Sequence, residues 1–234
     1  MNLIRLGSAE NAPFPNPHMA QSEPDGLLAW GGDLSVGRLR NAYAQGIFPW
    51  YSEGQPILWW SPAQRAGFDP KAMHLPRRFK RWLRCCPWRL ATDTRFDEVV
   101  AGCAVPRDDD GGTWILPEMR AAYGALHRAG DAHSIEVLDG NRLVGGLYGV
   151  ASGGVFCAES MFSAETHSSK VALLALAAIW SRVDGEWIDA QIPSAHLATL
   201  GATTIARDRY LDFLSDHAES IEWPEINLRA ASLL

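Results

Sequence analysis

An acid and an amide interrupt an apolar stretch near the end of the chain. In residues 187–192 (WIDAQI), Asp189 and Gln191 stand two positions apart among Trp, Ile and Ala. Because side chains alternate along a strand, this spacing predicts that Asp189 and Gln191 face the same way, with Cα atoms about 7 Å apart. A carboxylate can take a proton and an amide can hold a reactant by hydrogen bonding, so the pair is a candidate for catalysis. The alternative is an outer sheet face that touches water.

A second carboxylate occurs in the neighbouring stretch VFCAESMF, residues 155–162. The same alternation places Glu159 on the face of Val155, Cys157 and Met161. A carboxylate in such surroundings is either half-exposed at a cleft or buried with a partner. Two acid-bearing strands that flank one apolar helix favour a ligand site, because ligands in such sheets bind where neighbouring strands splay or reverse order.

Other catalytic motifs are missing from the sequence. There is no HExxH, P-loop, GxGxxG or GxSxG pattern, and the seven histidines lack ligand spacing. His133 and His196 could act as bases, although a lone His at the start of a strand or helix is more often structural. The acidic run at residues 108–110 could attract a cation, but a solvated turn is favoured. We therefore predict neither a metal nor another cofactor.

The charge is unevenly distributed. Residues 71–95 hold eight Lys or Arg and one acid, a net +7, whereas the rest of the chain holds 13 basic and 26 acidic residues, a net −13. Within this segment, PRRFKRWLRC predicts a short helix with Phe79, Trp82 and Leu83 inward. The basic face is either a solvated helix surface or a phosphate-binding patch on a protein that otherwise repels anions.

Composition limits the class of protein. The chain has 234 residues, 47% of them hydrophobic, which suffices for a sizeable core. The N-terminus has no apolar signal region, and the longest apolar run, residues 171–180, is too short to span a bilayer. The four cysteines form no CxxC pair, as expected of free thiols. We expect a cytoplasmic protein, monomeric and without a membrane partner.

The order of predicted elements indicates an α/β (α+β) fold. Residues 1–62, rich in Pro, Gly and Trp, form a small N-terminal domain with a helix at 35–45, and residues 63–234 form the larger domain. A helix starting near Pro117 precedes strands at 133–138, 142–150 and 155–162. An apolar helix over 168–182, capped by Ser168, leads to a strand at 187–192 and a helix at 195–200. A helix between consecutive strands implies a parallel pair in a mixed, mostly antiparallel sheet.

From residue 132 onward this order resembles the GCN5-related acetyltransferase fold. In that family a Q/RxxGxG/A turn holds the pyrophosphate of acetyl-CoA. The corresponding stretch here, SMFSAETHSSK, contains no glycine. An acetyl-CoA-dependent transferase is therefore the second hypothesis, and a non-enzymatic RNA- or peptide-binding module is the third.

The sequence resembles the bacterial leucyl/phenylalanyl-tRNA–protein transferases more specifically. The matching stretches follow that family's order: PDGLLAWGGDLS (24–35), AYAQGIFPWYS (42–52), ILWWSP (57–62), GTWI (112–115), HSIEV (133–137), LVGGLYGV (143–150), ESMFS (159–163) and IDAQ with HLATLGA. The resemblance implies transfer of Leu or Phe from aminoacyl-tRNA (Leu-tRNA, Phe-tRNA), or of Met, to the α-amine of proteins with N-terminal Arg or Lys. It also implies marking for degradation in the N-degron pathway, a GCN5-related acetyltransferase-like C-terminal domain, a cytoplasmic location and no metal or nucleotide cofactor.

The resemblance also assigns residues. The family's catalytic pair corresponds to Asp189 and Gln191. Leu147, Leu176 and Trp180 stand where family members often carry Met or Phe, and Ser194 stands where we expect Asn. The substrate-binding residues are Trp50, Trp114, Leu147, Glu159, Met161, Leu176 and Trp180; the adenosine-binding residues are Tyr43, Tyr123, Ser163 and Ser194; the residues expected to hold tRNA phosphates are Lys71, Arg77, Arg78, Lys80, Arg81 and Arg84.

The chemistry of such a transfer needs little from the protein. An aminoacyl ester is already activated, and an N-terminal amine with a pKa of about 7.7–8.0 is partly neutral, so positioning is the main task. We expect Asp189 to attract the ammonium, take its proton and fix the orientation of Gln191, and the Gln191 carbonyl to accept an amine N–H. Glu159 would set the preference for a basic N-terminus or orient the donor and the amine; the alternative is a buried structural carboxylate.

Overall fold

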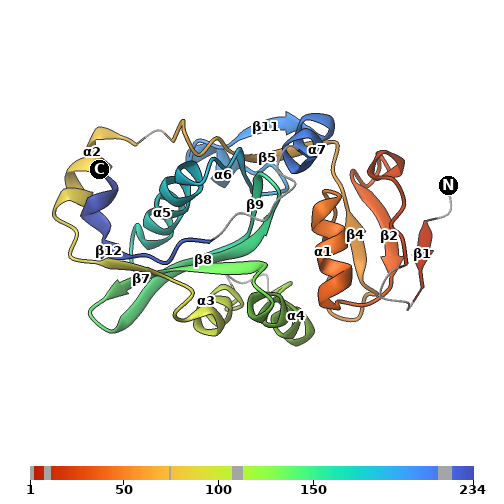
Figure 1. The fold of residues 1–234 in the computed structure, drawn as a ribbon, viewed down its shortest axis with the longest axis horizontal. Helices are drawn as coiled ribbons and strands as arrows, with labels where there is room; N and C mark the ends of the chain where they lie inside the picture. Colours follow the sequence, from red (N-terminus) through yellow and green to blue (C-terminus); the bar gives the residue numbers. More distant parts are fainter. Residues whose placement is uncertain (1–2, 8–11, 74, 107–112, 216–222) are drawn as a thin grey trace.

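The computed structural model describes residues 3–7, 12–73, 75–106, 113–215 and 223–234. Two sheets divide the chain between β4 and β5 (Figure 1). The small sheet has the order β1-β2-β4-β3 and packs with helix α1, Val36–Ala44. Its strands are β1 (Ile4–Leu6), β2 (Leu27–Gly31), β3 (Phe48–Pro49) and β4 (Leu58–Trp60). The proposed division into domains at residues 62 and 63 stays a prediction.

In the described part of the chain, the large sheet contains the remaining eight strands. Its order is β11-β5-β10-β9-β8-β7-β6-β12, and among the pairings described within this sheet only that of β9 and β10 is parallel. The mixed, mostly antiparallel sheet is therefore confirmed, whereas the finer likeness to acetyltransferases stays a prediction. The strands are β5 (Gln64–Phe68), β6 (Arg89–Thr92), β7 (Ala132–Asp139), β8 (Arg142–Ser152), β9 (Val155–Ser163), β10 (Trp187–Asp189), β11 (Thr203–Ala206) and β12 (Asn227–Arg229).

Helices cover both faces of the large sheet. Helix α5 (Ser168–Arg182) crosses one face, while α3 (Phe96–Cys103) and α4 (Pro117–Arg128) lie on the other (Figure 1). Two hydrophobic cores follow, one shared by α1, α3 and α4 and one built around α5. The other helices are α2 (Arg77–Arg84), α6 (Ala195–Thr199) and α7 (Arg207–Ser215), with single 3-10 turns at Pro17–Met19 and Ala230–Leu233.

The crossover between β9 and β10 is the connection that the sequence predicted. Helix α5 joins the two parallel strands and is buried on nearly every side, because it packs against β7, β8 and β9 and against the 3-10 turn Ala230–Leu233. Its cap differs from the prediction. The N-cap is His167 in a left-handed conformation (φ 79°), and Ser168 is the first helical residue, where its hydroxyl donates to the Glu165 carbonyl at 2.8 Å.

Two predicted helix starts are confirmed. The Ser35 hydroxyl accepts from the Arg38 amide at the start of α1, and α4 begins at Pro117. All four cysteines are free thiols. Within the described ranges, the helices are too short or too polar to cross a bilayer. The predicted turn at residues 108–110 lies outside the described residues.

Strand β10 is shorter than predicted. The sequence predicts a strand over residues 187–192, but β10 ends at Asp189. Gln191 then adopts a left-handed conformation with φ 59°, which ends the alternation of side chains. The expectation that Asp189 and Gln191 project from the same face of one strand was therefore wrong. The chain instead bends sharply between Asp189 and Gln191.

Strand β9 contains a bulge at Glu159. In its pairing with β8, Gly149 lies opposite Ala158 and Tyr148 lies opposite Ser160, so Glu159 has no ladder partner of its own. A bulge adds one residue to one strand and changes the direction of the side chains that follow.

This bulge changes which residues share a face. Val155 and Cys157 lie in the core on the α3–α4 side, whereas Met161 packs with the core around α5. The prediction that Glu159 shares a face with all three was wrong for Met161, because strict alternation holds only along an unbroken strand. Glu159 stands where the two faces exchange.

Gly149 is required at the bulge because a side chain would collide with the facing strand. A Cβ at this position would run into the carbonyl oxygen of Cys157. We expect Gly149→Ala to lower the free energy of unfolding by about 1–3 kcal/mol, as overpacking of a well-packed interior does. Urea unfolding would measure it. The matched control is Gly7→Ala, where a Cβ meets no atom within 4 Å; equal stabilities of the two variants would contradict the prediction.

Candidate active site

Asp189 is held by a buried ion pair with Arg65. The Arg65 Nε donates to Asp189 Oδ1 at 3.1 Å, and its Nη2 pairs with Oδ2. The side chains of Arg65 and Asp189 are 1% and 0% exposed. Strands β5 and β10 are antiparallel neighbours, and Gly67, which faces Asp189 in the ladder, leaves room for the close approach. The carboxylate thus points into the protein.

The remaining contacts of Arg65 connect three parts of the fold. Its Nη1 donates to the Gly46 carbonyl at 3.3 Å, beyond the end of α1. Its Nη2 also lies 3.1 Å from the Tyr210 hydroxyl on α7, and its guanidinium packs over the rings of Phe48 and Tyr210. Burial lowers the pKa of this guanidinium, but the attraction of Asp189 outweighs it, so the pKa of Arg65 is raised and the group stays charged.

The backbone at Gln191 is fixed from two sides. Its amide N–H donates to Asp189 Oδ1 at 3.1 Å, and its carbonyl accepts from the Ala66 amide at 3.0 Å. These bonds hold the left-handed residue, a conformation that is strained for a side chain other than Gly or Asn. The Gln191 side chain points away from Asp189, and its Nε2 donates to Glu159 Oε1 at 2.9 Å.

Glu159 receives a second hydrogen bond from a chain of buried tyrosines. The Tyr123 hydroxyl donates to Oε2 at 2.8 Å, and the hydroxyls of Tyr43 and Tyr123 are 2.7 Å apart. Burial raises the pKa of Glu159 to about 7, although the Tyr123 hydrogen bond offsets part of this effect. The carboxyl group can therefore gain or lose a proton near neutral pH.

Two cavities meet at Glu159 and Gln191. The tryptophan cavity, of about 100 Å³, is lined by Phe48, Pro49, Trp50, Trp114, Glu159, Ala190, Gln191 and Ile192. The central cavity, of about 270 Å³, is lined by Phe68, Trp114, Leu147, Ala158, Glu159, Ser160, Met161, Leu173, Ala190, Gln191, Ser194, His196 and Leu197. Their common wall is made of Trp114, Glu159, Ala190 and Gln191.

A third cavity continues from the central one. This serine cavity, of about 580 Å³, is lined by Gly102, Val105, Pro106, Met161, Phe162, Ser163, Ala164, Ser169 and His196. Met161 and His196 line both the central and the serine cavity. The three spaces therefore form a row, with the polar groups of Glu159 and Gln191 at one of the two junctions.

The structure brings most of the predicted apolar residues to these cavities. Trp50 and Trp114 line the tryptophan cavity, and Leu147 and Met161 line the central cavity. Leu176 and Trp180 are fully buried within the core around α5 and line neither cavity. They belong to the same hydrophobic core as Leu147 and Met161, which line the central cavity.

The residues expected near the adenosine separate into two groups. Tyr43 and Tyr123 are buried behind Glu159, where their hydroxyls are hydrogen-bonded. Ser163 lines the serine cavity, and Ser194 lines the central cavity while its hydroxyl caps α6 by accepting from the Leu197 amide at 3.2 Å. Only the two serines therefore adjoin open space.

The two histidines considered as bases have different surroundings. His133 is buried, lies 2.7 Å from Asp93 and stacks on Trp223, as a structural residue would. His196 lines the junction of the central and serine cavities. Among the residues that the structure describes, none of the His, Cys, Asp and Glu clusters is arranged to hold a metal ion.

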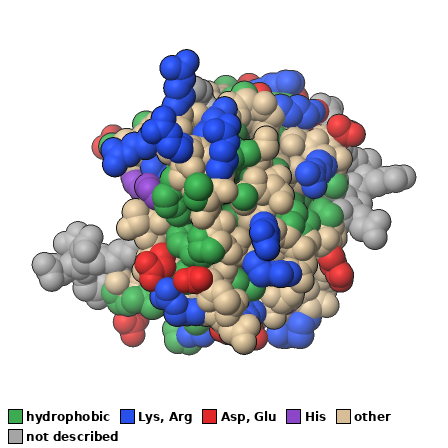
Figure 2. All heavy atoms as spheres, turned by 90° about the vertical axis from the view of Figure 1, so that its left-hand side faces the viewer, with side chains coloured by type: hydrophobic (Ala, Val, Ile, Leu, Met, Phe, Trp, Pro, Cys, Tyr) green, Lys and Arg blue, Asp and Glu red, His purple; other side chains and the backbone are tan. Residues whose placement is uncertain are grey.

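The basic segment forms an exposed surface. Figure 2 shows Lys and Arg side chains gathered on the end of the molecule that carries α2. The six residues expected to hold phosphates are all exposed, and none has an ion-pair partner within the described ranges. These residues are Lys71, Arg77, Arg78, Lys80, Arg81 and Arg84.

Sequence analysis missed Arg65 and Tyr210. Arg65 is the one charged residue in the strand QRAGF, and a lone Arg among apolar strand residues signals a buried partner. The identity of that partner, 124 residues away, depends on the order of the strands in the sheet. Tyr210 carried no local signal, since an apolar-faced helix such as α7 commonly contains a tyrosine.

Two models of one protein family match the chain. Residues 68–215 match the family described as Leucyl/phenylalanyl-tRNA protein transferase, and residues 32–63 match its N-terminal domain. A leucyl/phenylalanyl-tRNA–protein transferase from Xanthomonas euvesicatoria pv. vesicatoria is 56% identical over 207 residues, 88% of this chain and 83% of that protein. The transferase of the same name from Klebsiella pneumoniae is 50% identical over 215 residues, 92% of this chain and 91% of that protein.

We expect the Arg65–Asp189 pair to be strongly coupled. Arg65→Met leaves a buried carboxylate without its partner, which costs about 3–5 kcal/mol of unfolding free energy. Asp189→Asn removes the charge of Asp189 but keeps an acceptor for the Gln191 amide. Because the double variant then leaves no buried charge without its partner, it should lose at least about 1 kcal/mol less than the sum of the single variants. Urea unfolding of all four proteins measures the coupling. Additive losses would show that the two groups do not depend on each other.

The titration of Glu159 should be visible as a pH-dependent stability. Its pKa in the folded protein, about 7, lies above the ordinary value of 4.5, so the folded protein binds this proton more tightly than the unfolded chain does. The resulting stabilisation is fully present below pH 4.5 and is lost as the pH rises through 7. Relative to Glu159→Gln, the unsubstituted protein should lose roughly 2–3 kcal/mol between pH 5 and pH 8 in urea unfolding. Parallel curves for the two proteins would refute the raised pKa.

Proposed function

The chain belongs to the leucyl/phenylalanyl-tRNA–protein transferase family, and we propose that it transfers Leu or Phe from aminoacyl-tRNA to the α-amine of proteins with N-terminal Arg or Lys. It is an aminoacyltransferase. The observation that carries the proposal is the position of Gln191, whose side-chain amide is fixed by Glu159 on the common wall of two cavities. Such a wall suits a reaction in which two substrates enter from different sides.

The reaction asks for positioning and for proton transfer. The amine nitrogen attacks the ester carbonyl, a peptide bond forms and the ester C–O bond breaks. The proton that the amine nitrogen loses is balanced by one that the leaving ribose oxygen gains. Because Gln191 Nε2 donates to Glu159, the carbonyl oxygen of the same amide is turned away from Glu159. We assign this oxygen the role of accepting an amine N–H, which aims the nitrogen lone pair at the ester.

Asp189 acts in this proposal as a positioning residue. Its oxygens are bonded to Arg65 and to the Gln191 amide, and its side chain is fully buried. A fully buried carboxylate cannot contact an incoming amine directly, so we do not assign Asp189 the proton transfer that the sequence suggested. Its contribution is to hold Gln191 in the left-handed conformation that directs the side chain toward Glu159.

Glu159 is the titratable group that is hydrogen-bonded to the side-chain amide of Gln191. Its pKa of about 7 is close to that of an N-terminal amine, which suits proton exchange between the two. It lines both the tryptophan and the central cavity. We therefore assign Glu159 the orientation of the Gln191 amide and of the incoming amine, in preference to recognition of the acceptor's basic side chain.

The donor occupies the central and serine cavities in this proposal. Trp114, Leu147 and Met161 offer apolar surface for a Leu or Phe side chain, with Leu176 and Trp180 packed beneath. Ser163 and Ser194 lie where the terminal adenosine would be bound. The exposed basic surface around α2 would hold the tRNA phosphates.

The acceptor enters past Trp50, through the tryptophan cavity. Outside residues 71–95 the chain carries a net −13, from 13 basic and 26 acidic residues, which attracts proteins with basic N-termini. The product of such a transfer would be marked for degradation in the N-degron pathway. We place the reaction in the cytoplasm, where aminoacyl-tRNA is made.

Transfer of labelled leucine from Leu-tRNA to a protein that begins with Arg tests the function. We expect label on the free-amine protein and none on an N-acetylated copy, because the attack needs an unblocked amine. Gln191→Ala should lower kcat about 100-fold or more with a much smaller change in KM for Leu-tRNA, as expected when a positioning contact is lost. Scintillation counting of the precipitated protein measures the label, and initial rates at several Leu-tRNA concentrations give kcat and KM.

The controls separate this function from its alternatives. Gln64→Ala makes the same change at an exposed glutamine of β5 that lines none of the three cavities, and it should retain most of the turnover. No label from Leu-, Phe- or Met-tRNA would reject the function and direct attention to acetyl-CoA binding, measured by calorimetry. Unchanged turnover in Gln191→Ala would reject the assigned role of the amide while leaving the transfer reaction intact.

A further inference from the structure

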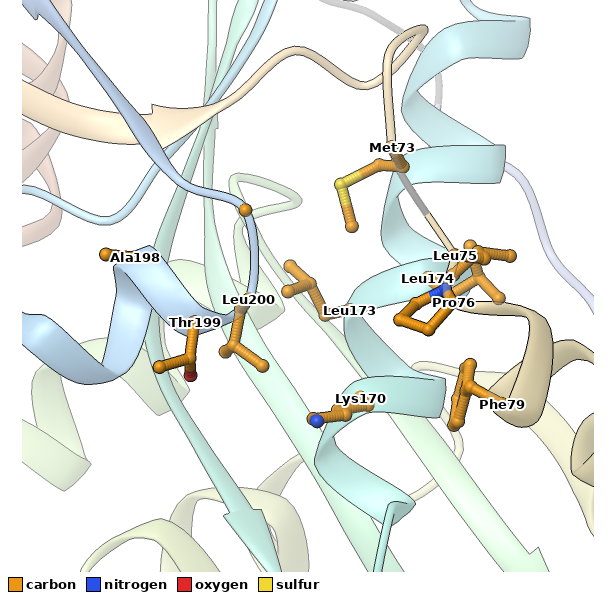
Figure 3. Close-up of a pocket in the computed structure, with 11 residues that line it drawn as sticks. Met73, Leu75, Pro76, Phe79, Lys170, Leu173, Leu174, Ala198, Thr199 and Leu200 are labelled. Atoms are coloured by element: carbon orange, nitrogen blue, oxygen red, sulfur yellow. The ribbon is translucent and has the colours of Figure 1, made fainter.

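A separate pocket lies between the basic helix and the central cavity. Met73, Leu75, Pro76 and Phe79 form one side of this outer pocket, α5 forms its floor, and the end of α6 forms the other side (Figure 3). Its volume is about 190 Å³. The residues from α5 and α6 are Lys170, Leu173, Leu174, Ala198, Thr199, Leu200 and Gly201.

The outer pocket suits a single planar ring. An apolar cavity of about 150 Å³ is large enough for benzene, so the space admits one six-membered ring with little room to spare. Phe79, Pro76 and Leu173 supply flat or broad apolar walls. Among the described residues, Lys170 is the one ionisable residue that lines it, and Figure 3 shows its amine on the floor between α6 and Phe79. An apolar slot with a cation at its edge matches a nucleobase and the phosphate attached to it.

The surroundings of the outer pocket favour a nucleic acid. Phe79 belongs to an aromatic group in which its ring stacks on Trp82 at 5.6 Å and meets His167 edge-on at 5.5 Å. On the outer side of the same helix, the arginines and lysines lack ion-pair partners in the part of the chain that the structure describes. Unneutralised positive charge next to aromatic rings is the composition of surfaces that bind single-stranded nucleic acid.

The outer pocket also lies on the path between the two proposed contacts of the tRNA. Leu173 lines both this pocket and the central cavity. Helix α6 begins at the central cavity with His196 and Leu197 and ends at the outer pocket with Thr199. A strand whose end lies in the central cavity and whose phosphates reach α2 must therefore pass over the outer pocket.

We propose that the outer pocket binds an unpaired pyrimidine base of the tRNA, in one of the two nucleotides that precede the aminoacylated adenosine. The base stacks on Phe79, and Lys170 pairs with its phosphate. The inference rests on the proposed function, since it assumes an aminoacyl-tRNA donor. It extends that function by adding a specificity contact outside the cavities that hold the aminoacyl group.

The test compares two donors, intact Leu-tRNA and 3′-O-leucyl-adenosine, which lacks the preceding nucleotides. The measured quantity is the ratio of kcat/KM for Leu-tRNA to kcat/KM for leucyl-adenosine. Loss of base stacking should lower this ratio about fivefold to tenfold in Phe79→Leu, and loss of the amine should lower it about threefold in Lys170→Met. Arg182→Met, which removes an exposed charge from the far end of α5, is the matched control and should leave the ratio unchanged.

A modified tRNA identifies the base directly. Deacylated tRNA with an abasic site at each of the two positions in turn is titrated against the unsubstituted protein and Phe79→Leu, with Kd measured by fluorescence anisotropy. One abasic tRNA should bind the unsubstituted protein about tenfold more weakly, and Phe79→Leu should show little further loss with it, because the two changes remove the same contact.

Two results would overturn the proposal: an unchanged ratio in both variants, whether from no loss or from an equal loss with both donors, or multiplicative losses when the abasic site and Phe79→Leu are combined. Equal loss with both donors would assign the pocket to the aminoacyl group or to the fold. The binding titration needs no transfer reaction. A protein that shows the base-dependent Kd without any transfer would therefore reject the proposed function and keep the base pocket.

Discussion

The buried ion pair between Arg65 and Asp189 holds the candidate site together. A charge can be buried in a protein only when another charge and further hydrogen bonds compensate for the lost water, and here both conditions are met. The Arg65 guanidinium bonds to Asp189, to the Gly46 carbonyl and to Tyr210, which belong to β10, to the segment after α1 and to α7. One side chain therefore ties the small sheet, the large sheet and a C-terminal helix to the same point.

Two interruptions of regular strand structure bring the polar groups together. A bulge leaves Glu159 outside the ladder between β8 and β9, and a left-handed residue directs Gln191 away from the end of β10. In unbroken parallel strands, side chains on neighbouring strands would stand side by side on one face. The two irregular residues instead turn toward each other across the boundary between the two cores, where cavities can form. The hydrogen bond between Gln191 Nε2 and Glu159 closes the arrangement.

Charge is unevenly distributed over the molecule, with the excess of basic residues concentrated in residues 71–95. The exposed basic residues near α2 lie at one end of the large sheet, and the rest of the chain is acidic. In the proposed reaction, the anionic tRNA would be attracted to the basic end and a basic N-terminus to the acidic remainder of the surface. Between them, a carboxyl group with a pKa of about 7 and a fixed amide adjoin apolar cavities. Separation of this kind lets two oppositely charged substrates approach without competing for one surface.

The sequence by itself determined the class of fold and most helices, and it singled out Asp189 and Gln191 as the candidate catalytic pair. Ser35 and Pro117 marked helix starts, because capping depends on residues close together in the sequence. The apolar helix between two strands required the parallel pair, because a crossover connection brings the second strand back in the same direction. The motif containing Asp189 and Gln191 predicted a strand that the structure contains in part, since β10 ends at Asp189. Only the tertiary structure decided that Asp189 faces inward to Arg65 and that Gln191 faces Glu159, because a bulge and a left-handed residue reverse the simple alternation. The partner of Asp189 lies 124 residues away, and such a pairing depends on the order of strands across the whole sheet, which no local pattern records.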